Sequence, residues 1–334
     1  MSKPAFQRKP PPLLAQIAMG VMMDGFLRLF IKLGNPNRVF AALSKRRAKE
    51  LATRNPFAGY VPTKHDVFVA CYVKSGTNWT MQIAHQLLNH GKAEFGHIHE
   101  VIPWPDTKNM GPMRGYAVPL EDESALRASP EGKRVIKTHF DWEDLPYSED
   151  ARYIIVIRDP KDVFVSAYHF FSFFPVRSVD LWIKLFCSDN MFFGSWGKST
   201  AGYWAQRSRP NVLLLSFKSM KRDLPGTVRK IADFLQVRTD EETIQRVVDK
   251  SSFEYMKTIE DKFGVWKMIP WRSHVQMMRK GAVGGSAELL SPDQQRQMDA
   301  YFMAELKRLG SDFPYEEFCN VTPASDRAEH AGAA

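Results

Sequence analysis

The segment Val69–Ile83, VACYVKSGTNWTMQI, places a cation and several hydrogen-bond donors where an apolar run gives way to helical spacing. Backbone N–H groups at the start of a helix, reached through such a turn, commonly bind phosphate. Gly76 would let the backbone approach a ligand closely, and Trp79 would offer a flat face to a purine. The alternative is a plain strand-to-helix turn with Trp79 in the core. The candidate phosphate-binding residues are Lys74, Ser75, Gly76, Thr77 and Asn78.

A histidine follows the apolar residues of the segment VIKTHFDW. Lys137 and His139 are two residues apart, so on a strand their side chains would point the same way. A neighbouring cation disfavours the imidazolium form, and a neutral imidazole can act as a general base. His139 is therefore a candidate catalytic base, although a structural role is the commoner use of a single histidine.

Two further segments carry cations suited to an anionic ligand. In IRDPKDVFVSAYHF, Arg158 leaves an apolar run and Ser166 lies about two helical turns later. A salt bridge from Arg158 to Asp159 or Asp162 is the alternative. The loop MMRKGAVGG adds two cations that would be free to reach an anion, Arg279 and Lys280.

Two other motifs have weaker support. GSWGKST contains Gly-Lys-Ser, but the residue five positions before Gly197 is Phe192, where a Walker A loop requires glycine. HIHE, at His97–Glu100, offers side chains that can bind zinc, but no cysteine accompanies them. A plain loop is the alternative for that segment.

The elements that would position these side chains alternate between strand and helix. Four β-rich runs predict strands at Asp66–Tyr72, Arg134–Lys137, Arg152–Ile157 and Asn211–Ser216. All but RVIK are almost continuously apolar, as in a parallel sheet that is covered on both faces. Helical spacing follows three of them, at Asn78–Asn89, Asp162–Phe171 and Leu224–Leu235. The pattern predicts a P-loop-like α/β fold, a parallel sheet flanked by helices, with its ligand site at the carboxyl ends of the strands.

The composition narrows the class of protein. The chain has 334 residues, a net charge of +9 and three widely spaced cysteines. A globular protein of this length can bury a substantial core. The surplus positive charge suits a nucleotide, a nucleic acid or a membrane surface, unless the basic surface has no specific partner. Cysteines without a metal-type pair favour a reducing, cytoplasmic setting.

The N-terminal part allows more than one interpretation. Residues 13–33 are largely apolar, but a second kind of residue recurs at every fourth position: Gln16, Gly20, Asp24, Arg28 and Lys32. This pattern predicts an amphipathic helix, and the charges near its centre argue against a membrane span. No small-residue cleavage site follows Met23, which argues against a signal peptide. The helix could pack on the domain or, with the basic run SKRRAK at Ser44–Lys49, rest on a membrane surface. We divide the chain into a helical extension (1–60), a single α/β domain (61–322) and a disordered tail (323–334).

Taken together, the motifs resemble the cytosolic-type sulfotransferase family, whose donor is 3′-phosphoadenosine 5′-phosphosulfate (PAPS). The resemblance covers roughly Val61–Leu290. YVKSGTNW resembles the family's 5′-phosphosulfate loop, KTHF the segment with its catalytic base, and RDPKDVFVSAYHF its 3′-phosphate segment. SFKSM, SSFEYM and RKGAVG resemble its later nucleotide contacts, and GSWGKSTAGYW its substrate-side loop. The resemblance implies the sulfotransferase fold for residues 61–322.

The resemblance also implies roles for individual residues. Lys74 would contact the bridging oxygen and the 5′-phosphate, Lys137 would steady the transferring sulfuryl group, and His139 would take the acceptor's proton. Trp79 and Phe253 would hold the adenine. The 3′-phosphate would be bound by Arg158, Ser166, Arg279, Lys280 and Gly281. The other nucleotide-binding positions that the resemblance implies are Ser75, Gly76, Thr77, Asn78, Phe217, Ser251, Ser252, Met256 and Met278.

Three positions depart from the family pattern. Phe217 stands where many members have a tyrosine, so a hydroxyl contact to the nucleotide would be missing. Gly285-Ser286 replaces a frequent Asp-Trp pair. The family's dimer motif, Lys-x-x-x-Thr-Val-x-x-x-Glu, is absent from ELLSPDQQ. We therefore expect no dimer through that segment and leave the oligomeric state open.

We expect an enzyme that moves a sulfuryl group from PAPS to a hydroxyl, or less readily an amine, and releases adenosine 3′,5′-bisphosphate (PAP). Sulfuryl transfer, like phosphoryl transfer, has a loose in-line transition state, so positioning and charge supply most of the catalysis and no metal is expected. Pro103–Pro105 and Phe170–Phe174 would line a pocket for a small apolar acceptor.

Two alternatives remain at this point. A P-loop phosphotransferase or nucleotidase would need a Walker A lysine and a metal-holding carboxylate. A non-catalytic nucleic-acid-binding protein would present its cations as a stripe, whereas here they lie at predicted strand ends, so no nucleic-acid partner is expected.

Overall fold

The structure is a computed structural model that describes residues 10, 12–32, 36–110, 113–172, 178–191, 193–265 and 275–322. At its centre lies a sheet of four strands: β1 (Asp66–Ala70), β2 (Arg134–Thr138), β3 (Arg152–Ile157) and β4 (Val212–Ser216). The strands are all parallel and lie in the order β2-β1-β3-β4. The predicted α/β fold with a parallel sheet flanked by helices is confirmed.

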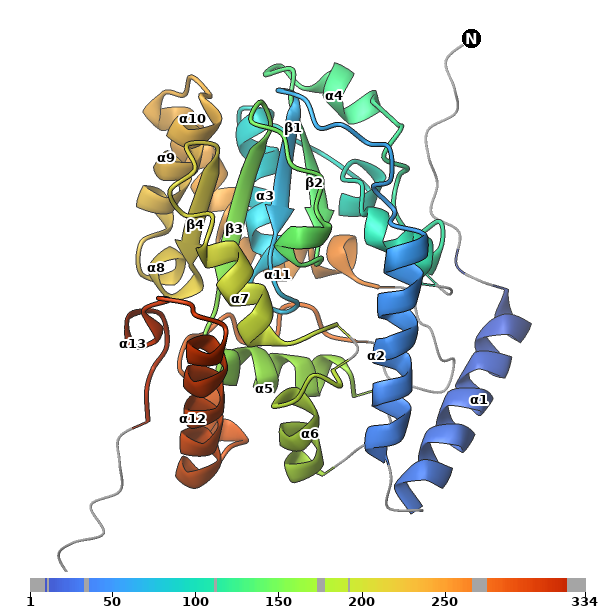
Figure 1. The fold of residues 1–334 in the computed structure, drawn as a ribbon. Coiled ribbons are helices and arrows are strands. Elements are labelled where there is room, and N and C mark those ends of the chain that lie inside the picture. Colours follow the sequence, from blue (N-terminus) through green and yellow to red (C-terminus); the bar gives the residue numbers. More distant parts are fainter. Residues whose placement is uncertain are drawn as a thin grey trace, which may run out of the picture.

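The strands are buried on both faces, as their apolar runs predict. Val67 and Val69 of β1 point into one apolar core, while Phe68 and Ala70 point into the other. This alternation follows from the two-residue period of a strand. The first core is completed by α3 (Thr77–Leu88), α9 (Leu224–Leu235) and α10 (Glu241–Ser251). The second is completed by α5 (Pro160–Phe170), α6 (Val179–Phe186), α7 (Trp196–Trp204) and α12 (Pro292–Arg308), seen below and in front of the sheet in Figure 1.

Shorter elements connect these layers. The α-helical ones are α4 (Ser124–Ala128), α8 (Phe217–Arg222), α11 (Phe253–Thr258) and α13 (Tyr315–Phe318). The 3₁₀ turns include η1 (Ile98–Glu100), η2 (Pro105–Asn109), η4 (Trp142–Asp144), η5 (Glu260–Phe263) and η6 (Gly285–Glu288). Residues of η1, η2, α8, α11, η5 and η6 line the cavity that is described below.

A buried charged network joins α5 to α12. Lys161 is fully buried, and its ammonium contacts the carboxylates of Asp159, at 3.3 Å, and Asp299. The Tyr315 hydroxyl donates to Asp299 over 2.8 Å. Two carboxylates around one lysine compensate the free-energy cost of burying its charge. Loss of one partner would leave part of the buried charge uncompensated. The network therefore fixes the start of α5 at Pro160, two residues after Arg158.

Two helices precede the sheet domain, α1 (Leu13–Lys32) and α2 (Pro36–Thr53), and they lie side by side in Figure 1. The helix predicted over residues 13–33 is confirmed as α1. An amphipathic helix would turn its polar row towards solvent and its apolar side chains inwards. In α1, however, Gly20 of that row is buried, while the apolar Leu13, Ile17 and Val21 face outwards. A glycine has no side chain to hold two helices apart, which suits the inward position.

The division of the chain at residue 60 stays a prediction. Phe40 of α2 is fully buried in the core of the sheet domain, with its ring centroid 6.3 Å from that of Trp182. The N-terminal section therefore contributes to the domain's packing. The tail predicted at 323–334 lies outside the described residues. Among the described helices, none combines the length and apolar character that crossing a membrane requires.

Candidate active site

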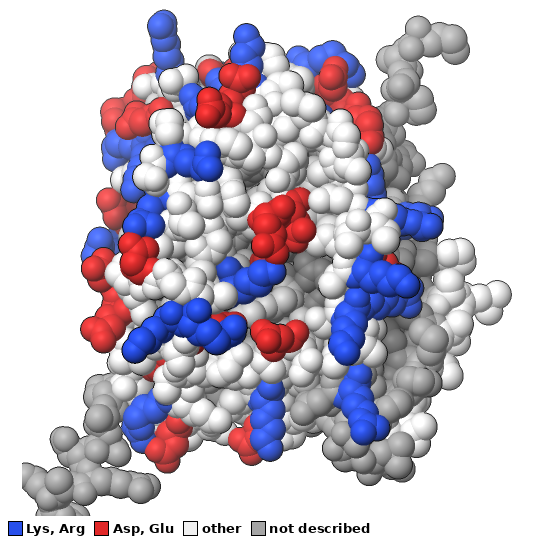
Figure 2. Space-filling view, in the orientation of Figure 1, with Lys and Arg blue, Asp and Glu red and all other residues white. Residues whose placement is uncertain are grey.

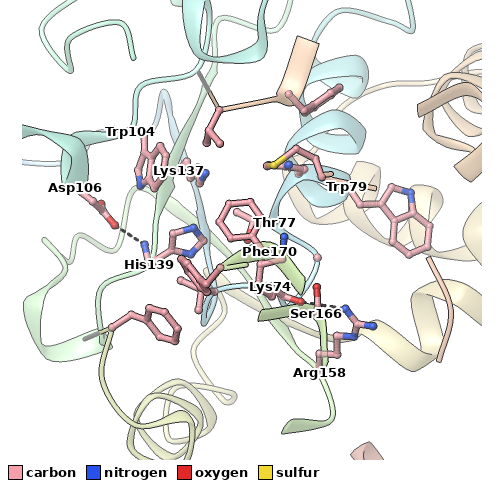
Figure 3. Close-up of a pocket in the computed structure, with 18 of the residues that line it drawn as sticks. Lys74, Thr77, Trp79, Trp104, Asp106, Lys137, His139, Arg158, Ser166 and Phe170 are labelled. Atoms are coloured by element: carbon pink, nitrogen blue, oxygen red, sulfur yellow. Dashed lines mark hydrogen bonds between the residues drawn. The ribbon is translucent and has the colours of Figure 1, made fainter. Parts of the chain in front are cut away.

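One cavity of about 860 Å³ opens at the carboxyl ends of the strands. It brings together residues from Phe40 to Gly285, which are contributed by strand ends, helix starts and loops (Figure 3). Three of the predicted site residues do not line it: Ser75, Ser251 and Ser252. Those that do are Lys74, Gly76, Thr77, Asn78, Trp79, Lys137, His139, Arg158, Ser166, Phe217, Phe253, Met256, Met278, Arg279, Lys280 and Gly281.

The turn after β1 has an unusual backbone. Lys74 has φ 64° and Gly76 has φ 111°, both in the left-handed region. A Cβ atom at Gly76 would lie 2.8 Å from the Phe217 ring, so this close approach requires glycine. The N-cap residue of α3 is Gly76, which has no side chain that could cap the helix. The first backbone N–H groups of α3 are thus suited to binding an anion.

Arg158, directly after β3, fixes the far side of this turn. Its guanidinium donates to the backbone oxygens of Lys74 and Ala282, each over 3.1 Å, and so ties the turn to the basic loop. Its Nε lies 4.0 Å from the Asp162 carboxylate, so the salt bridge weighed as an alternative is present as a long contact. The guanidinium carbon lies 4.3 Å from the centroid of the Phe217 ring. Phe217 thus provides an aromatic face for Arg158.

Of the two predicted catalytic lysines, Lys137 is buried and Lys74 is half-buried, and both border the cavity. Desolvation, together with the charges of Arg158 and Lys137, lowers the pKa of Lys74 to about 7. Burial also lowers the pKa of Lys137 to about 7, against the opposing effect of the Asp106 carboxylate. The Lys137 ammonium lies 3.4 Å from the centroid of the Trp104 ring and 3.5 Å from His99 Nε2. Such ammonium groups are stabilised when an anion enters the cavity.

His139 is held in one tautomer and one orientation. Its Nδ1 lies 2.9 Å from the backbone oxygen of Cys71, and since a carbonyl only accepts, Nδ1 carries the proton. Nε2 is then the basic atom of the ring. The backbone N–H of His139 donates to Asp106 over 2.7 Å, and the ring meets the Trp104 ring edge-on at 5.6 Å. Figure 3 shows His139, Lys137 and Lys74 grouped around one space.

The described part of the chain leaves several buried polar atoms near this cavity without a hydrogen-bond partner. They include the Nε of Arg158 and the Nε1 of Trp104, two residues that line the cavity. A buried polar atom without a partner costs free energy, and a polyanionic ligand would supply acceptors. The α3 N-terminus, the cations and these atoms together fit a nucleotide that carries phosphates at two ends.

The basic loop differs from its prediction, because its two cations are not free. Arg279 and Lys280 both contact the carboxylate of Glu288, Lys280 at 2.6 Å. His169 of α5 lies 3.0 Å from the same carboxylate. Gly281 follows with φ 56°, and a Cβ atom there would lie 2.4 Å from the Phe253 ring. The Glu288 carboxylate thus pairs with the two cations that, by the resemblance, would bind the 3′-phosphate.

We expect Glu288→Gln to bind PAP more tightly than the wild type, by about two- to tenfold. The amide removes the negative charge that competes for Arg279 and Lys280. Titration calorimetry measures the affinity, and Glu254→Gln is the matched control, since it removes an exposed carboxylate next to Phe253. Unchanged or weaker binding by the Glu288 variant would contradict this prediction.

The two weaker motifs have structural explanations. Both ring nitrogens of His97 have partners, because Nδ1 accepts from the His99 N–H over 3.1 Å and Nε2 lies 3.0 Å from the Gly264 oxygen. His99 Nδ1 lies 3.0 Å from the Ile102 oxygen. These contacts use the nitrogens that a zinc ion would need, which favours the loop interpretation of HIHE.

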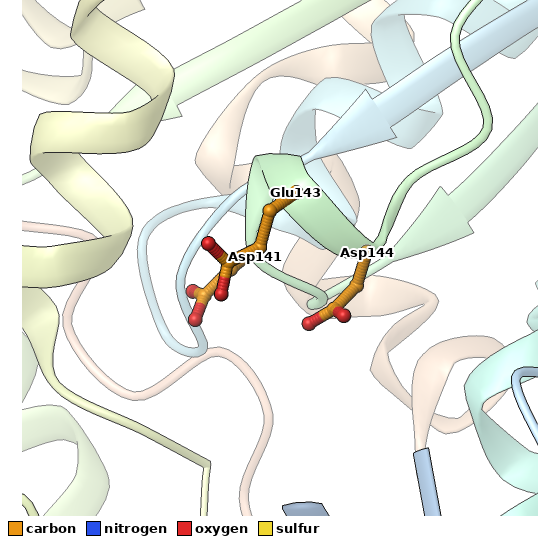
Figure 4. A group of neighbouring side chains, drawn as sticks. All are labelled: Asp141, Glu143 and Asp144. Atoms are coloured by element: carbon orange, nitrogen blue, oxygen red, sulfur yellow. The ribbon is translucent and has the colours of Figure 1, made fainter. Parts of the chain in front are cut away.

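GSWGKST belongs to a capped helix rather than to a phosphate loop. Ser195 caps α7 by accepting from the N–H groups of Gly197 and Lys198. Lys198 contacts the carboxylates of Glu143, at 2.6 Å, and Asp141, at 3.8 Å. Asp141 and Glu143 form an acidic group with Asp144 (Figure 4), and the lysine supplies its counter-charge.

The rest of the cavity is apolar and aromatic. Trp104 lines it, as do Phe170 and Phe171, whereas Pro103 and Pro105 do not. Phe173 and Phe174, also predicted to line the pocket, lie outside the described residues. Further apolar lining comes from positions that the sequence did not single out: Phe40, Leu43, Leu51, Met113, Tyr116, Phe140, Val165, Phe193, Phe263 and Val265.

The sequence also gave no prediction for three polar groups at the site. Asp106 orients the His139 backbone, the Cys71 carbonyl orients its ring, and His99 contacts Lys137. Asp106 directly follows the Pro-Trp-Pro segment that was predicted to line the pocket, so its position was a usable signal. A backbone carbonyl leaves no signal in the sequence.

A comparison with known protein families decides which family this arrangement belongs to. The sulfotransferase domain family profile matches residues 64–310. The chain belongs to the sulfotransferase family. Sulfotransferase 2A1 of Macaca fascicularis is 29% identical over 309 residues, which cover 88% of this chain and 100% of the relative. Luciferin sulfotransferase of Photinus pyralis is 34% identical over 210 residues, which cover 58% of this chain and 56% of the relative.

Solved structures agree on the sulfotransferase fold. Retinol dehydratase in complex with androsterone and the inactive cofactor PAP has a TM-score of 0.65 at 23% identity, covering 82% of this chain and 88% of its own. A mouse sulfotransferase complexed with PAP has a TM-score of 0.58 at 23% identity, covering 81% of this chain and 94% of its own. The predicted family, the fold and the identification of the chain as a sulfotransferase enzyme are confirmed.

Proposed function

We propose that this sulfotransferase transfers the sulfuryl group of PAPS to the hydroxyl of a small apolar acceptor. One observation carries the proposal: His139 Nε2, Lys74, Lys137 and an apolar wall share a single cavity at the carboxyl ends of the strands. A general base beside an apolar wall suits an alcohol. Two cations beside the turn into α3 suit the charged end of the donor.

The proposed reaction divides the work among three residues. The acceptor oxygen forms a bond to sulfur as the bond from sulfur to the phosphate oxygen breaks, and PAP leaves with that electron pair. His139 Nε2 takes the hydroxyl proton as the new bond forms. Lys137 stabilises charge on the sulfuryl oxygens and Lys74 stabilises charge on the leaving phosphate. Because these cations are already in place, the chain needs little reorganisation during transfer.

The donor's two phosphate ends would be bound by separate parts of the cavity. The turn Lys74–Asn78 and the start of α3 would bind the 5′ end. Arg158, Ser166 and the Arg279–Gly281 loop would bind the 3′ end. The neighbouring structures complexed with PAP support this choice of donor. We propose no metal in the reaction, because lysines supply the positive charge. The absence of a metal and the cytoplasmic location both stay predictions.

The acceptor is proposed to be an apolar alcohol. Phenylalanine, tryptophan and methionine side chains dominate the wall beside His139. Burial of apolar surface of a ligand against such a wall is favourable and tolerates different shapes. Androsterone and retinol, which are bound in two of the similar solved structures, are apolar alcohols, and this supports the proposal.

PAP is expected to raise the melting temperature by several degrees at about 100 times its Kd, since binding to the folded state stabilises it by ~2.7 kcal/mol. ATP lacks a 3′-phosphate and should stabilise far less at the same concentration. Differential scanning fluorimetry measures both. A Glu288→Gln sample provides a matched protein in which the PAP shift should be larger. Equal stabilisation by ATP would overturn PAPS as the donor.

A further inference from the structure

We propose that the α1–α2 hairpin docks this sulfotransferase on the surface of an anionic lipid bilayer. In this arrangement α1 inserts its apolar row between the lipids, and the basic side chains of α2 contact the headgroups. The proposal is independent of the donor and of the catalytic residues.

The first observation is the outward-facing row on α1. Leu13, Ile17, Val21 and Leu29 follow a four-residue spacing and are 61%, 38%, 60% and 52% exposed, respectively. Leu14 beside them is 81% exposed. A helix that packs for stability alone would turn such a row towards the domain, whereas among the α1 residues whose burial is described Gly20 is the buried one. The exposed row is the geometry of a helix that lies in the plane of a membrane interface.

The second observation is the charge of the adjacent helix. Residues 36–53, which form α2, contain five basic residues and a single acidic one, Glu50. Arg38, Lys45 and Lys49 are exposed, and Glu50 pairs with Arg46 at 2.8 Å. Figure 2 shows Lys and Arg side chains gathered on the part of the surface formed by α2. Clustered cations next to an apolar helix are attracted to anionic headgroups.

This charge also decides between a bilayer and a second copy of the chain. A dimer built on the apolar row of α1 would bring two basic α2 helices towards each other, and the like charges would oppose association. A bilayer with anionic lipids presents the opposite charge to the same surface. The net charge of +9 favours the same partner.

The hairpin also lies at the cavity. Phe40, Leu43 and Leu51 of α2 form part of its wall. An apolar alcohol dissolved in the bilayer would therefore meet the cavity beside the docking surface. This last step rests on the proposed function, whereas docking itself does not.

Sedimentation with vesicles tests the proposal on the full chain. Wild-type protein should bind phosphatidylcholine vesicles that contain about a quarter phosphatidylglycerol at least tenfold more strongly than vesicles of phosphatidylcholine alone. The exposed pair Ile17→Glu with Val21→Glu should weaken binding to the anionic vesicles by at least about tenfold, as should Lys45→Glu with Lys49→Glu. Leu309→Glu is the matched control, because Leu309 is a 40% exposed leucine directly after α12, and it should bind as the wild type does.

The stabilisation by PAP is measured in parallel, so a failure of docking and a failure of the proposed function are told apart. Docking is overturned if the wild type does not bind anionic vesicles, or if both double variants bind as well as the wild type. It is also overturned if light scattering shows a dimer that the Ile17 and Val21 substitutions dissociate, because a second copy would then be the partner. If the apolar pair misfolds, the lysine pair decides the outcome by itself.

Discussion

His139→Asn is expected to lower kcat by roughly 10²- to 10⁴-fold with an alcohol acceptor, the range that general-base catalysis contributes. Asparagine keeps a donor that can reach the Cys71 carbonyl, which His139 contacts over 2.9 Å, so the loop should keep its conformation. It has no basic nitrogen to take the acceptor's proton. The affinity for PAP should stay within a few-fold of the wild type, because the nucleotide is held by other residues. Steady-state kinetics and titration calorimetry measure the two quantities.

The choice of acceptor supplies the control for this variant. A strongly acidic phenol ionises without help, so its turnover should fall much less than that of the alcohol. Loss of both activities together with loss of PAP binding would indicate a misfolded site. Near-native turnover of an unactivated alcohol by the His139 variant would show that the proposed base is wrong.

Lys74→Ala should reduce both binding and turnover. A hydrogen bond to a charged group contributes about 1.5–3 kcal/mol, so PAP binding should weaken by roughly ten- to 100-fold. Loss of charge stabilisation on the leaving phosphate should lower kcat by a further ~10²- to 10³-fold. Lys198→Ala is the matched control, since that lysine pairs with Glu143 outside the cavity. A Lys74 variant that keeps wild-type PAP affinity would contradict the assignment.

The lowered pKa values of Lys74 and Lys137 also predict how PAP binding depends on pH. Their pKa values of about 7 mean that, in the free protein, both are charged below that pH and largely neutral above it. A bound anion favours the charged form and raises both pKa values. PAP binding at pH 8 should therefore take up protons, and the affinity should fall as the pH rises. Calorimetry in two buffers of different ionisation enthalpy measures the uptake, and Lys74→Arg, which stays charged, should reduce it.

The sequence predicted those features that are encoded within a short run of consecutive residues. The strands were visible as apolar runs, and α9 has the bounds Leu224–Leu235 that its spacing predicted. The turn around Gly76 was visible because lysine, glycine and hydroxyl residues stand together between a strand and a helix. Lys137 and His139 both line the cavity, as their two-residue spacing predicts. The roles of all these residues in catalysis stay predictions.

What the sequence did not reveal depends on contacts between distant segments. The pairing of Glu288 with Arg279 and Lys280 depends on how η6 folds back, and the contact with His169 spans 119 positions. The contribution of α2 to the cavity wall depends on where the N-terminal section packs. Neither the composition nor the periodicity of a segment encodes which distant segment it will meet. The outward turn of the apolar row on α1 was missed for the same reason.

The buried network around Lys161 has a consequence for the order in which the nascent chain can complete its donor site. The fourth strand is finished at Ser216, but the Asp299 carboxylate and the Tyr315 hydroxyl that complete this network are synthesised much later. Until they arrive, Lys161 at the start of α5 has only one of its two carboxylate partners, Asp159. We therefore expect the start of α5, and Arg158 two positions before it, to reach its final position only after α12 has docked. A ribosome-bound chain that ends before α12 would have a complete sheet with an unfinished nucleotide site.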